Sequence, residues 1–316
     1  MIDPRTSIFV AGHNGMVGSA VVRTLRVRGY TDIVTAPRQE LDLADWEAVT
    51  AFFRSRRIGA VVDAAAKVGG ILANDSLPYD FLMTNMLIQN NLLRAALAHR
   101  VGKFVFLGSS CIYPKLAPQP MREEHLLTGP LEPTNQWYAI AKISGVMACR
   151  AARKQHGLDA VSLMPTNLYG PNDNFDLQSS HVLPAMMRKF DEARDAGHAD
   201  VTLWGSGAPF REFLHVDDLA AAVVFALEHG LAEDLYNVGC GSDVTIKDLA
   251  HLVQRTVGHR GAIRWDATKP DGTPRKLMDS ARLMALGWRP TIPLEAGLAD
   301  TYAWFREHRD RVRQLA

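Results

Sequence analysis

A glycine-rich loop near the N-terminus constrains the fold of this chain more than any other feature. An apolar run over residues 7–11 leads directly into Gly12-His13-Asn14-Gly15-Met16-Val17-Gly18, with a glycine at every third position. The apolar residues Val17, Val21 and Leu25 then follow at helical spacing. Glycines between a strand and a helix allow a tight turn, close approach of the backbone to a pyrophosphate, and close contact of helix with strand. The loop therefore predicts a dinucleotide site at the start of a βαβ unit.

The first half of the chain alternates short apolar runs with longer segments of helical period, which predicts strands joined by crossover helices. The expected strands are residues 7–11, 32–36, 60–65, 103–108 and 159–164. Several are continuously apolar, as in a parallel sheet covered by helices on both faces. After Pro165 a polar stretch interrupts the alternation. We expect an α/β fold with a doubly wound parallel sheet over residues 1–168 and a smaller α/β substrate lobe over 169–316. Residues of about 212–240 are expected to return to the sheet.

Charge and composition exclude several classes of partner. The 316 residues include 35 Lys and Arg against 34 Asp and Glu, so no overall charge favours nucleic acid or an anionic membrane. The longest clean apolar run, residues 219–227, is about half of the ~20 residues that a membrane helix needs. Cys111, Cys149 and Cys240 lie far apart, unlike a disulfide framework or a zinc site. We expect a soluble cytoplasmic protein that binds no metal, nucleic acid or membrane.

The end of the second strand bears on the choice of dinucleotide. A carboxylate about 20 residues after the glycine loop commonly holds the adenosine ribose of NAD. Here the strand ends in Thr35-Ala36-Pro37-Arg38, without a carboxylate. A cation at this position suits a 2′-phosphate, so the sequence predicts NADP(H) with Arg38 as its clamp. The alternative is that Arg38 is a solvated loop residue close to Glu40 and Asp42.

Tyr138 and Lys142 are candidates for acid–base chemistry. They stand four positions apart in a segment, residues 136–155, that reads as helix, so their side chains share one face. A nearby cation lowers the pKa of a tyrosine from ~10 toward the working pH of a general acid. Such a pair alone is equally consistent with an exposed helix surface. Ser109, directly after the strand at 103–108, should face the same crevice and could bond a substrate carbonyl.

The glycine loop, Ser109, Tyr138 and Lys142, in this order and spacing, resemble the extended short-chain dehydrogenase/reductases. Further stretches narrow the resemblance to the branch that epimerises and reduces GDP-4-keto-6-deoxymannose. These stretches are residues 12–18, 65–71, 109–114, 165–171, 211–218 and 269–276. The resemblance extends over nearly the whole chain.

The resemblance implies epimerisation at C3 and C5 followed by reduction of the C4 ketone. Inversion needs a base and an acid on opposite faces of the sugar, and Cys111 and His181 resemble that pair. A thiolate stabilised in an electropositive cleft is a competent base, and an imidazole a competent proton donor. Tyr138 would then protonate the C4 oxygen, assisted by Ser109 and Lys142. Without the resemblance, a buried structural cysteine and a structural histidine are the simpler readings.

The resemblance also implies binding residues and an assembly. The implied NADP(H) contacts are Gly12, Asn14, Gly15, Met16, Val17, Gly18, Arg38, Leu107, Gly108, Lys142, Pro165, Asn167, Leu168 and His181. The implied contacts with the GDP-sugar are Lys189, Trp204, Arg211 and Asp271. Position 189 is lysine where the resemblance implies arginine, and lysine lacks the bidentate grip on phosphate. Segments 79–100 and 136–155 correspond to a pair that forms dimer interfaces, so a homodimer is expected, although their apolar positions would also serve intramolecular packing.

Two alternatives remain open. One is another nucleotide-sugar 4-epimerase or 4,6-dehydratase of the same fold, which keeps its cofactor bound and returns the hydride. Cys111, where similar dehydratases have an acidic residue, speaks against the dehydratase. The other alternative is a non-catalytic NADP-binding regulator.

Overall fold

The computed structural model describes residues 2–269 and 271–310, and a six-stranded parallel sheet forms its centre. The strand order is β2-β1-β3-β4-β5-β9. The strands are β1 (Ile8–Ala11), β2 (Ile33–Val34), β3 (Ala60–Asp63), β4 (Lys103–Leu107), β5 (Asp159–Pro165) and β9 (Leu235–Val238). The predicted doubly wound parallel sheet is confirmed, because every strand expected in the first half of the chain lies in it.

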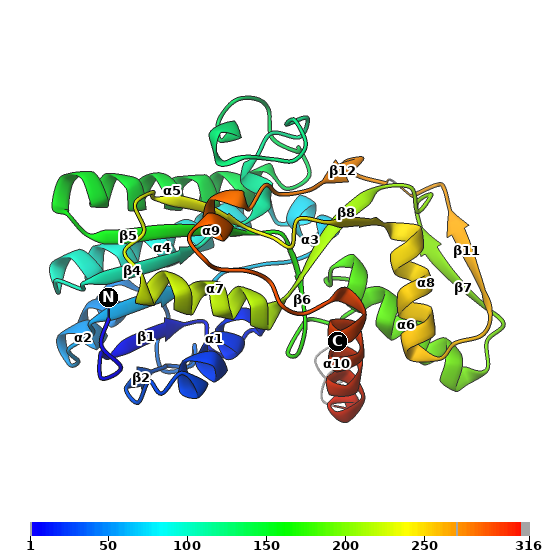
Figure 1. Ribbon diagram of the computed structural model, residues 1–316, viewed down its shortest axis with the longest axis horizontal. Helices are drawn as coiled ribbons and strands as arrows, with labels where there is room; N and C mark the ends of the chain where they lie inside the picture. The colour runs from blue at the N-terminus through cyan, green and yellow to red at the C-terminus, as the bar shows by residue number, and fades with distance from the viewer. Residues whose placement is uncertain (1, 270, 311–316) are drawn as a thin grey trace.

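Helices cover both faces of this sheet (Figure 1). One face carries α1 (Met16–Val27) and α7 (Val216–Glu228), and the other carries α2 (Trp46–Arg54), α4 (Pro78–Ala98) and α5 (Gln136–His156). Side chains alternate between the two cores: Val62 packs on the α1/α7 side and Val61 on the α4/α5 side. Burial on both faces explains why these strands are apolar without interruption.

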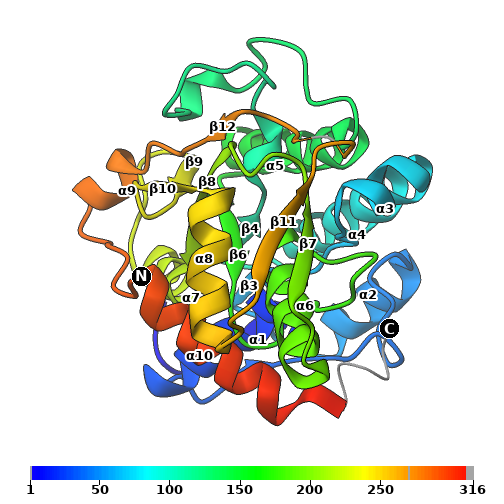
Figure 2. The same ribbon diagram turned by 90° about the vertical axis from the view of Figure 1, so that its right-hand side faces the viewer.

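A second lobe lies to the right of the sheet in Figure 1 and faces the viewer in Figure 2. Its four-stranded sheet contains β6 (Asn167–Tyr169), β8 (Phe210–His215), β10 (Asp243–Thr245) and β12 (Arg275–Lys276). A parallel pair joins β7 (Asp200–Trp204) to β11 (Ala262–Asp266). The helices of this lobe are α6 (Val182–Ala196), α8 (Ile246–Val257) and α10 (Leu294–Glu307), which pack around a separate apolar core.

The chain crosses between the two parts more than once. After β8 it enters α7 on the central sheet and then β9, which pairs with β5. Residues 212–215, expected to return to the central sheet, instead pair within the second lobe as part of β8. The reason is visible in β8 itself, where Phe213 packs in the lobe's core and Leu214 in the core beneath α7. The return to the central sheet therefore begins at Val216.

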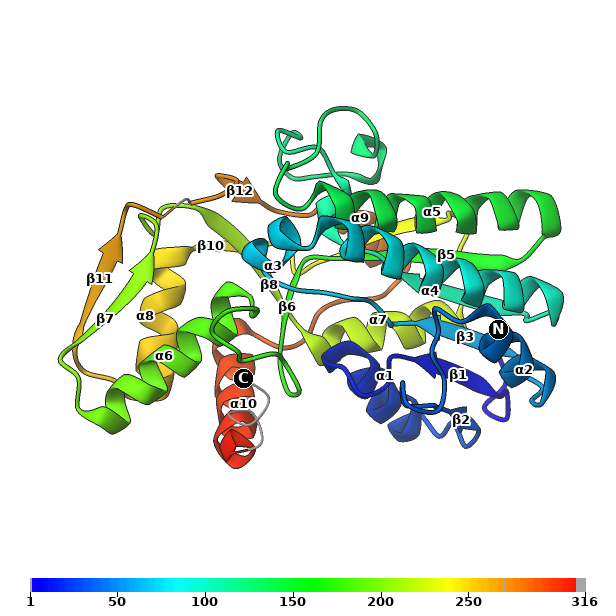
Figure 3. The same cartoon turned by 180° about the vertical axis from the view of Figure 1, so that it is seen from behind.

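Shorter elements complete the connections. The short helix α3 (Ile71–Ser76) follows β3 on the side of the second lobe (Figure 3), and α9 (Ala281–Ala285) packs against β9. Two 3-10 turns, η1 (Ser110–Ile112) and η2 (Glu123–His125), follow β4. Across residues 2–269 and 271–310, every helix is too short or too polar to cross a bilayer.

Candidate active site

The glycine loop joins β1 to α1 at the point where the strand order reverses. Gly12 has φ of 78°, and a Cβ atom on it would lie 2.8 Å from the carbonyl oxygen of Ala64, just after β3. A Cβ on Gly18 would collide with the carbonyl oxygen of Gly12. Gly15 is the N-cap of α1, and the first turn of this helix carries no acidic residue. The amides at the start of α1 therefore face the crevice without a competing carboxylate, an arrangement that fits a pyrophosphate.

Asn14 belongs to the glycine loop, and Arg38 follows β2 in the chain. Both residues are exposed, and Arg38 is in the turn after β2. No ion pair joins Arg38 to Glu40 or Asp42, all three of which the structure describes. The guanidinium is therefore available to an anion, as a clamp on a 2′-phosphate requires.

The end of β4 is tied to α5 by a buried lysine. Lys142 is 3% exposed, and its Nζ donates a hydrogen bond to the carbonyl oxygen of Leu107 at 2.8 Å. Gly108 follows and donates its N–H to the carbonyl of Leu163 on β5. Ser109 caps η1, accepting at Oγ from the N–H of Cys111 at 3.3 Å. These bonds bring Ser109, Cys111 and Lys142 together at the carboxyl edge of the sheet.

Tyr138 lies one helical turn before Lys142, and the Lys142 Nζ is 5.8 Å from the centre of its ring. Burial raises the pKa of Tyr138 above its ordinary 10, and the charges of Cys111 and Asp63 raise it further. Burial lowers the pKa of Lys142, while Asp63 opposes this effect. The expected lowering of the tyrosine pKa by Lys142 is not found, because burial dominates and the ammonium donates to Leu107. In this geometry Tyr138 is a phenol, which can give up a proton to a substrate oxygen.

Cys111 and His181 share a cationic neighbour, Lys276 of β12. Burial raises the pKa of the Cys111 thiol, whereas the charges of Lys276 and Lys142 and the bond with Ser109 lower it. Desolvation, and then Lys276, lower the pKa of His181. Because the charge of one ammonium acts on both groups, the thiol after β4 and the imidazole at the start of α6 lie in one region.

The loop before α6 is fixed against the chain that follows β3. The carbonyl oxygen of Ser179 accepts from the N–H of Gly70 at 2.9 Å. Within the loop, Asp176 accepts from the backbone and hydroxyl of Ser179. His181 then stands as N-cap of α6. These contacts hold His181 at the boundary between the central sheet and the second lobe.

The second lobe contributes an exposed aromatic face flanked by cations. Trp204 is 59% exposed, and the ammonium groups of Lys189 and Lys269 lie 5.8 and 5.4 Å from the centre of its ring. Arg211 is the register partner of Lys276, which continues the cationic surface toward Cys111. A nucleoside diphosphate needs this combination of a flat apolar surface and cations.

Asp271, expected as a substrate contact, is engaged with its own lobe. Its two carboxylate oxygens accept from the N–H and the hydroxyl of Ser206, both at 2.7 Å. Gly205 adopts φ of 80° directly beside this carboxylate, where any side chain would collide with it. Asp271 thus ties the turn after β7 to the segment leading to β12. Its charge also reaches Arg211, whose pKa burial lowers and Asp271 raises.

The remaining predicted cofactor residues lie at strand ends. Pro165 ends β5, and Asn167 and Leu168 form β6, where the Asn167 amide donates to the carbonyl of Glu212 at 2.8 Å. Met16 and Val17 form the first turn of α1. All these positions border the same edge of the sheet.

Two residues of the region were not identified as functional from the sequence. Lys276 lies inside a motif that suggested the resemblance, but no pattern indicated that its charge acts on Cys111 and His181. Asp63 is a fully buried carboxylate at the end of β3. In the sequence, Asp63 could have been identified only as an acidic residue at the end of an apolar strand, Ala60-Val61-Val62-Asp63.

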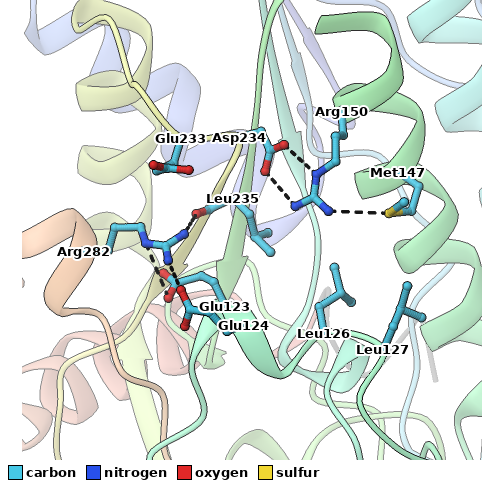
Figure 4. A pocket seen from close by; sticks show the side chains of 10 residues that line it. All are labelled: Glu123, Glu124, Leu126, Leu127, Met147, Arg150, Glu233, Asp234, Leu235 and Arg282. Atoms are coloured by element: carbon cyan, nitrogen blue, oxygen red, sulfur yellow. Dashed lines mark hydrogen bonds and ion pairs between the residues drawn. The ribbon is translucent and has the colours of Figure 1, made fainter. Parts of the chain in front are cut away.

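A separate pocket of 320 Å³ lies beside α5 and β9 (Figure 4). Its polar lining holds four carboxylates, those of Glu123, Glu124, Glu233 and Asp234, and two guanidiniums. Arg150 pairs with Asp234, and Arg282 with Glu123 and Glu124. Because the acids outnumber the cations, this pocket does not suit a nucleotide.

Known proteins share the sequence pattern and the fold of this chain. Residues 8–239 match the model of the NAD dependent epimerase/dehydratase family. The chain is 55% identical to "Probable GDP-L-fucose synthase 1" of Oryza sativa subsp. japonica, covering 98% of this chain and 94% of that protein. It is 54% identical to "GDP-L-fucose synthase" of Escherichia coli strain K12, covering 97% and 98%.

A solved structure of a GDP-L-fucose synthetase from Naegleria fowleri bound to NADP superposes with a TM-score of 0.90. The two chains are 28% identical over 98% of this chain and 97% of that one. From the family match and these relatives, the chain belongs to the NAD-dependent epimerase/dehydratase family and is an enzyme of its extended short-chain dehydrogenase/reductase type.

Proposed function

We propose that this enzyme converts GDP-4-keto-6-deoxy-D-mannose to GDP-L-fucose by 3,5-epimerisation and then NADPH-dependent reduction at C4. The observation that supports the proposal is the grouping of Ser109, Cys111, Tyr138 and Lys142 at the carboxyl edge of the sheet, with the charge of Lys276 acting on both Cys111 and His181. The names of the relatives and the NADP in the Naegleria structure support the substrate and the cofactor.

The residues along the edge of the sheet fit NADP(H). The glycine loop and the start of α1 would hold the pyrophosphate, and Arg38 the 2′-phosphate. The segments after β4 and β5 would border the nicotinamide end. When bound, NADPH supplies the hydride for the C4 ketone.

Cys111 acts as the base of the epimerisation. Protons on C3 and C5 are acidic because they flank the ketone, and the thiolate removes them. Burial keeps Cys111 largely protonated, so the ammonium groups of Lys276 and Lys142 are needed to stabilise the thiolate. His181, as an imidazolium, returns a proton on the opposite face and inverts that carbon. Before the second carbon reacts, the Cys111 thiol releases its proton to solvent and His181 takes one up.

Tyr138 is the proton donor of the reduction. Its phenol gives a proton to the C4 oxygen, to which the Ser109 hydroxyl donates a hydrogen bond. Lys142 holds its charge near this oxygen while it remains bonded to Leu107. Base and proton donor are different residues, so the two half-reactions can be separated by mutation.

The second lobe binds the GDP part of the substrate. Trp204 offers a ring face to guanine, while Lys189 and Arg211 meet the diphosphate. Asp271 contributes by holding Ser206 through two hydrogen bonds and by its charge, which raises the pKa of Arg211.

We also propose a homodimer through α4 and α5. The two helices pack together and leave Leu87, Ile140 and Met147 about two-fifths exposed on their outer side.

The test is incubation with GDP-4-keto-6-deoxymannose and NADPH. We expect one NADPH to be consumed for each GDP-L-fucose formed. Turnover with no net NADPH oxidation would favour a 4-epimerase or dehydratase. Tight NADPH binding without turnover of any keto-sugar nucleotide would favour a regulator.

A further inference from the structure

Asp63 is a buried carboxylate that the reaction described above does not use. It ends β3 and is fully buried. Its Oδ1 accepts from the N–H of Ala65 at 3.3 Å. Its Oδ2 has no hydrogen-bond partner among residues 2–269 and 271–310. Burying a carboxylate oxygen without a partner is costly, so this residue calls for an explanation beyond packing.

The alternation of β3 places the Asp63 side chain in the layer of the catalytic helix. Val61, two residues earlier, packs on the side of α4 and α5, so Asp63 points to that side as well. The register partner of Asp63 on β4 is Phe106, whose ring centre lies 4.8 Å from the Lys142 Nζ. The next residue, Leu107, accepts the hydrogen bond of Lys142. The carboxylate and the ammonium therefore lie in the same buried layer, one strand apart.

Asp63 supplies the carboxylate that acts on Lys142 in this buried layer. The titratable groups that act on Lys142 are Asp63, Cys111 and Cys149, and Asp63 is the carboxylate among them. From α5, Tyr138 and Cys149 also experience the Asp63 charge. Uncharged polar neighbours complete the layer, namely Ser162 of β5 and Gln89 of α4.

We propose that Asp63 is a positioning residue whose charge holds Lys142 as an ammonium ion and Tyr138 as a phenol, the form that donates a proton. This inference rests on the proposed role of Tyr138 in ketone reduction. Asp63 touches no reacting atom and acts through the two residues of α5.

The sign of the effect follows from electrostatics. An anion raises the pKa of both Lys142 and Tyr138, because it disfavours loss of a proton from either. Burial raises the pKa of Asp63 to about 6, so the carboxyl is charged at neutral and alkaline pH, where it is needed. Without this charge, Lys142 and Tyr138 should each lose a proton at a lower pH.

The first experiment compares Asp63→Asn and Asp63→Leu with the wild type in ketone reduction across pH, using GDP-4-keto-6-deoxymannose and NADPH. The alkaline limb of the kcat profile, where kcat falls as pH rises, is expected to shift to a lower pH by about 1 unit in both variants. Ser162→Ala, which removes an uncharged group from the same layer, should leave the limb in place. The pH dependence of solvent-deuterium exchange at C3 and C5 should shift less than that of reduction, since Asp63 reaches Cys111 only through Lys142, whereas Lys276 acts on the thiol directly. An unshifted limb in folded variants would overturn the proposal.

The second experiment needs neither turnover nor a variant of Asp63. In wild-type protein with 13Cζ-labelled tyrosine, the Tyr138 resonance, assigned by its loss in Tyr138→Phe, should show an inflection near pH 6 as Asp63 gains charge. A resonance that is flat from pH 5 to 7 would overturn the proposal even if both Asp63 variants failed to fold. If the proposed substrate is not turned over, this titration still decides the role of Asp63.

Discussion

Cys111 and Tyr138 lie in one buried region but serve different steps in the proposed reaction. Cys111 is on η1 behind β4, under the influence of Lys276, whereas Tyr138 is on α5 under the influence of Asp63. The two side chains have different charged neighbours, although Cys111 also acts on Tyr138, and Lys142 on Cys111. This separation predicts that single substitutions uncouple epimerisation from reduction.

Cys111→Ala should abolish incorporation of solvent deuterium at C3 and C5, because no other base replaces the thiolate. Reduction of the ketone should persist at a lower rate, since Tyr138 is untouched. NMR of the product formed in deuterated water measures both. Exchange as fast as in the wild type would show that Cys111 is not the base.

Tyr138→Phe should slow reduction by about 10²–10⁴-fold, the usual contribution of a general acid. Deuterium exchange into the keto-sugar should change far less. Absorbance at 340 nm follows NADPH oxidation, and NMR follows exchange. Equal losses in both would contradict the separate roles.

The pH dependence of exchange should follow the Cys111 thiolate. Burial raises the pKa of this thiol, so the thiolate is a minority below that pKa and its fraction grows tenfold per pH unit. Exchange should therefore rise with pH between about 6.5 and 8.5. In Lys276→Met the thiol pKa rises further, and exchange at pH 7.5 should fall by about tenfold.

Lys247→Met, which removes an exposed lysine in the first turn of α8, is the matched control and should leave exchange unchanged. A pH-independent exchange rate, or a Lys276 variant with normal exchange, would show that Lys276 does not stabilise a catalytic Cys111 thiolate.

At the scale of elements, the glycine loop shows how a local motif builds the cofactor site. Gly18 permits contact of α1 with the loop, and Gly15 leaves the crevice open in front of the helix. The two glycines therefore have different tasks, one in packing and one in binding.

Gly18→Ala should destabilise the protein by about 1–3 kcal/mol, because the added methyl collides with the Gly12 carbonyl. Gly15→Ala should leave the melting temperature unchanged, since its methyl would lie 3.5 Å from the same oxygen. Gly15→Ala should nevertheless weaken NADPH binding at least about tenfold by blocking close approach of the pyrophosphate. Thermal unfolding and fluorescence titration measure the two effects, and identical behaviour of the two variants would refute the distinction.

Periodicity and capping predict the longer elements well. The expected helix at residues 136–155 coincides with α5 to within one residue, and the expected strands differ from the observed ones by a few residues. The short strands β6, β10 and β12 were not predicted. A strand of two or three residues is too short to show an alternating hydrophobic pattern. β12 exists only because it pairs with Phe210 and Arg211 of β8, which are far away in sequence.

Contacts between segments that are distant in sequence were equally impossible to predict at the candidate site. The glycine loop, Ser109, Tyr138 and Lys142 were recognisable because spacing along one helix or at one strand end carries the information. The approach of Lys276 to Cys111 depends on β8 pairing with β12, which no local pattern reports. Asp63 and Phe106 likewise become neighbours only through pairing of β3 with β4.

At the scale of the whole molecule, the site lies between a cofactor-binding sheet and a substrate-binding lobe. β8 and α7 connect the two parts, with Phe213 in the core of the lobe and Val216 in the core beneath α7. The outer sides of α4 and α5 face away from this boundary (Figure 1), which leaves them available for a second copy.

Ile140→Glu should convert the proposed dimer to a monomer without unfolding it, because residue 140 is 39% exposed in the single chain. Lys154→Glu places the same charge at a polar exposed position of α5 and should leave the dimer intact. Sedimentation velocity distinguishes the two species. A wild-type monomer, or a dimer that survives Ile140→Glu, would contradict the α4/α5 interface.

The central claim is that one site inverts two carbons and reduces a third. NMR of the product formed from GDP-4-keto-6-deoxymannose and NADPH in deuterated water tests it most directly. The account predicts GDP-L-fucose with deuterium at C3 and C5 and hydrogen at C4, in an amount equal to the NADPH consumed. A product reduced at C4 but carrying hydrogen at C3 and C5 would contradict it and would identify a simple ketone reductase.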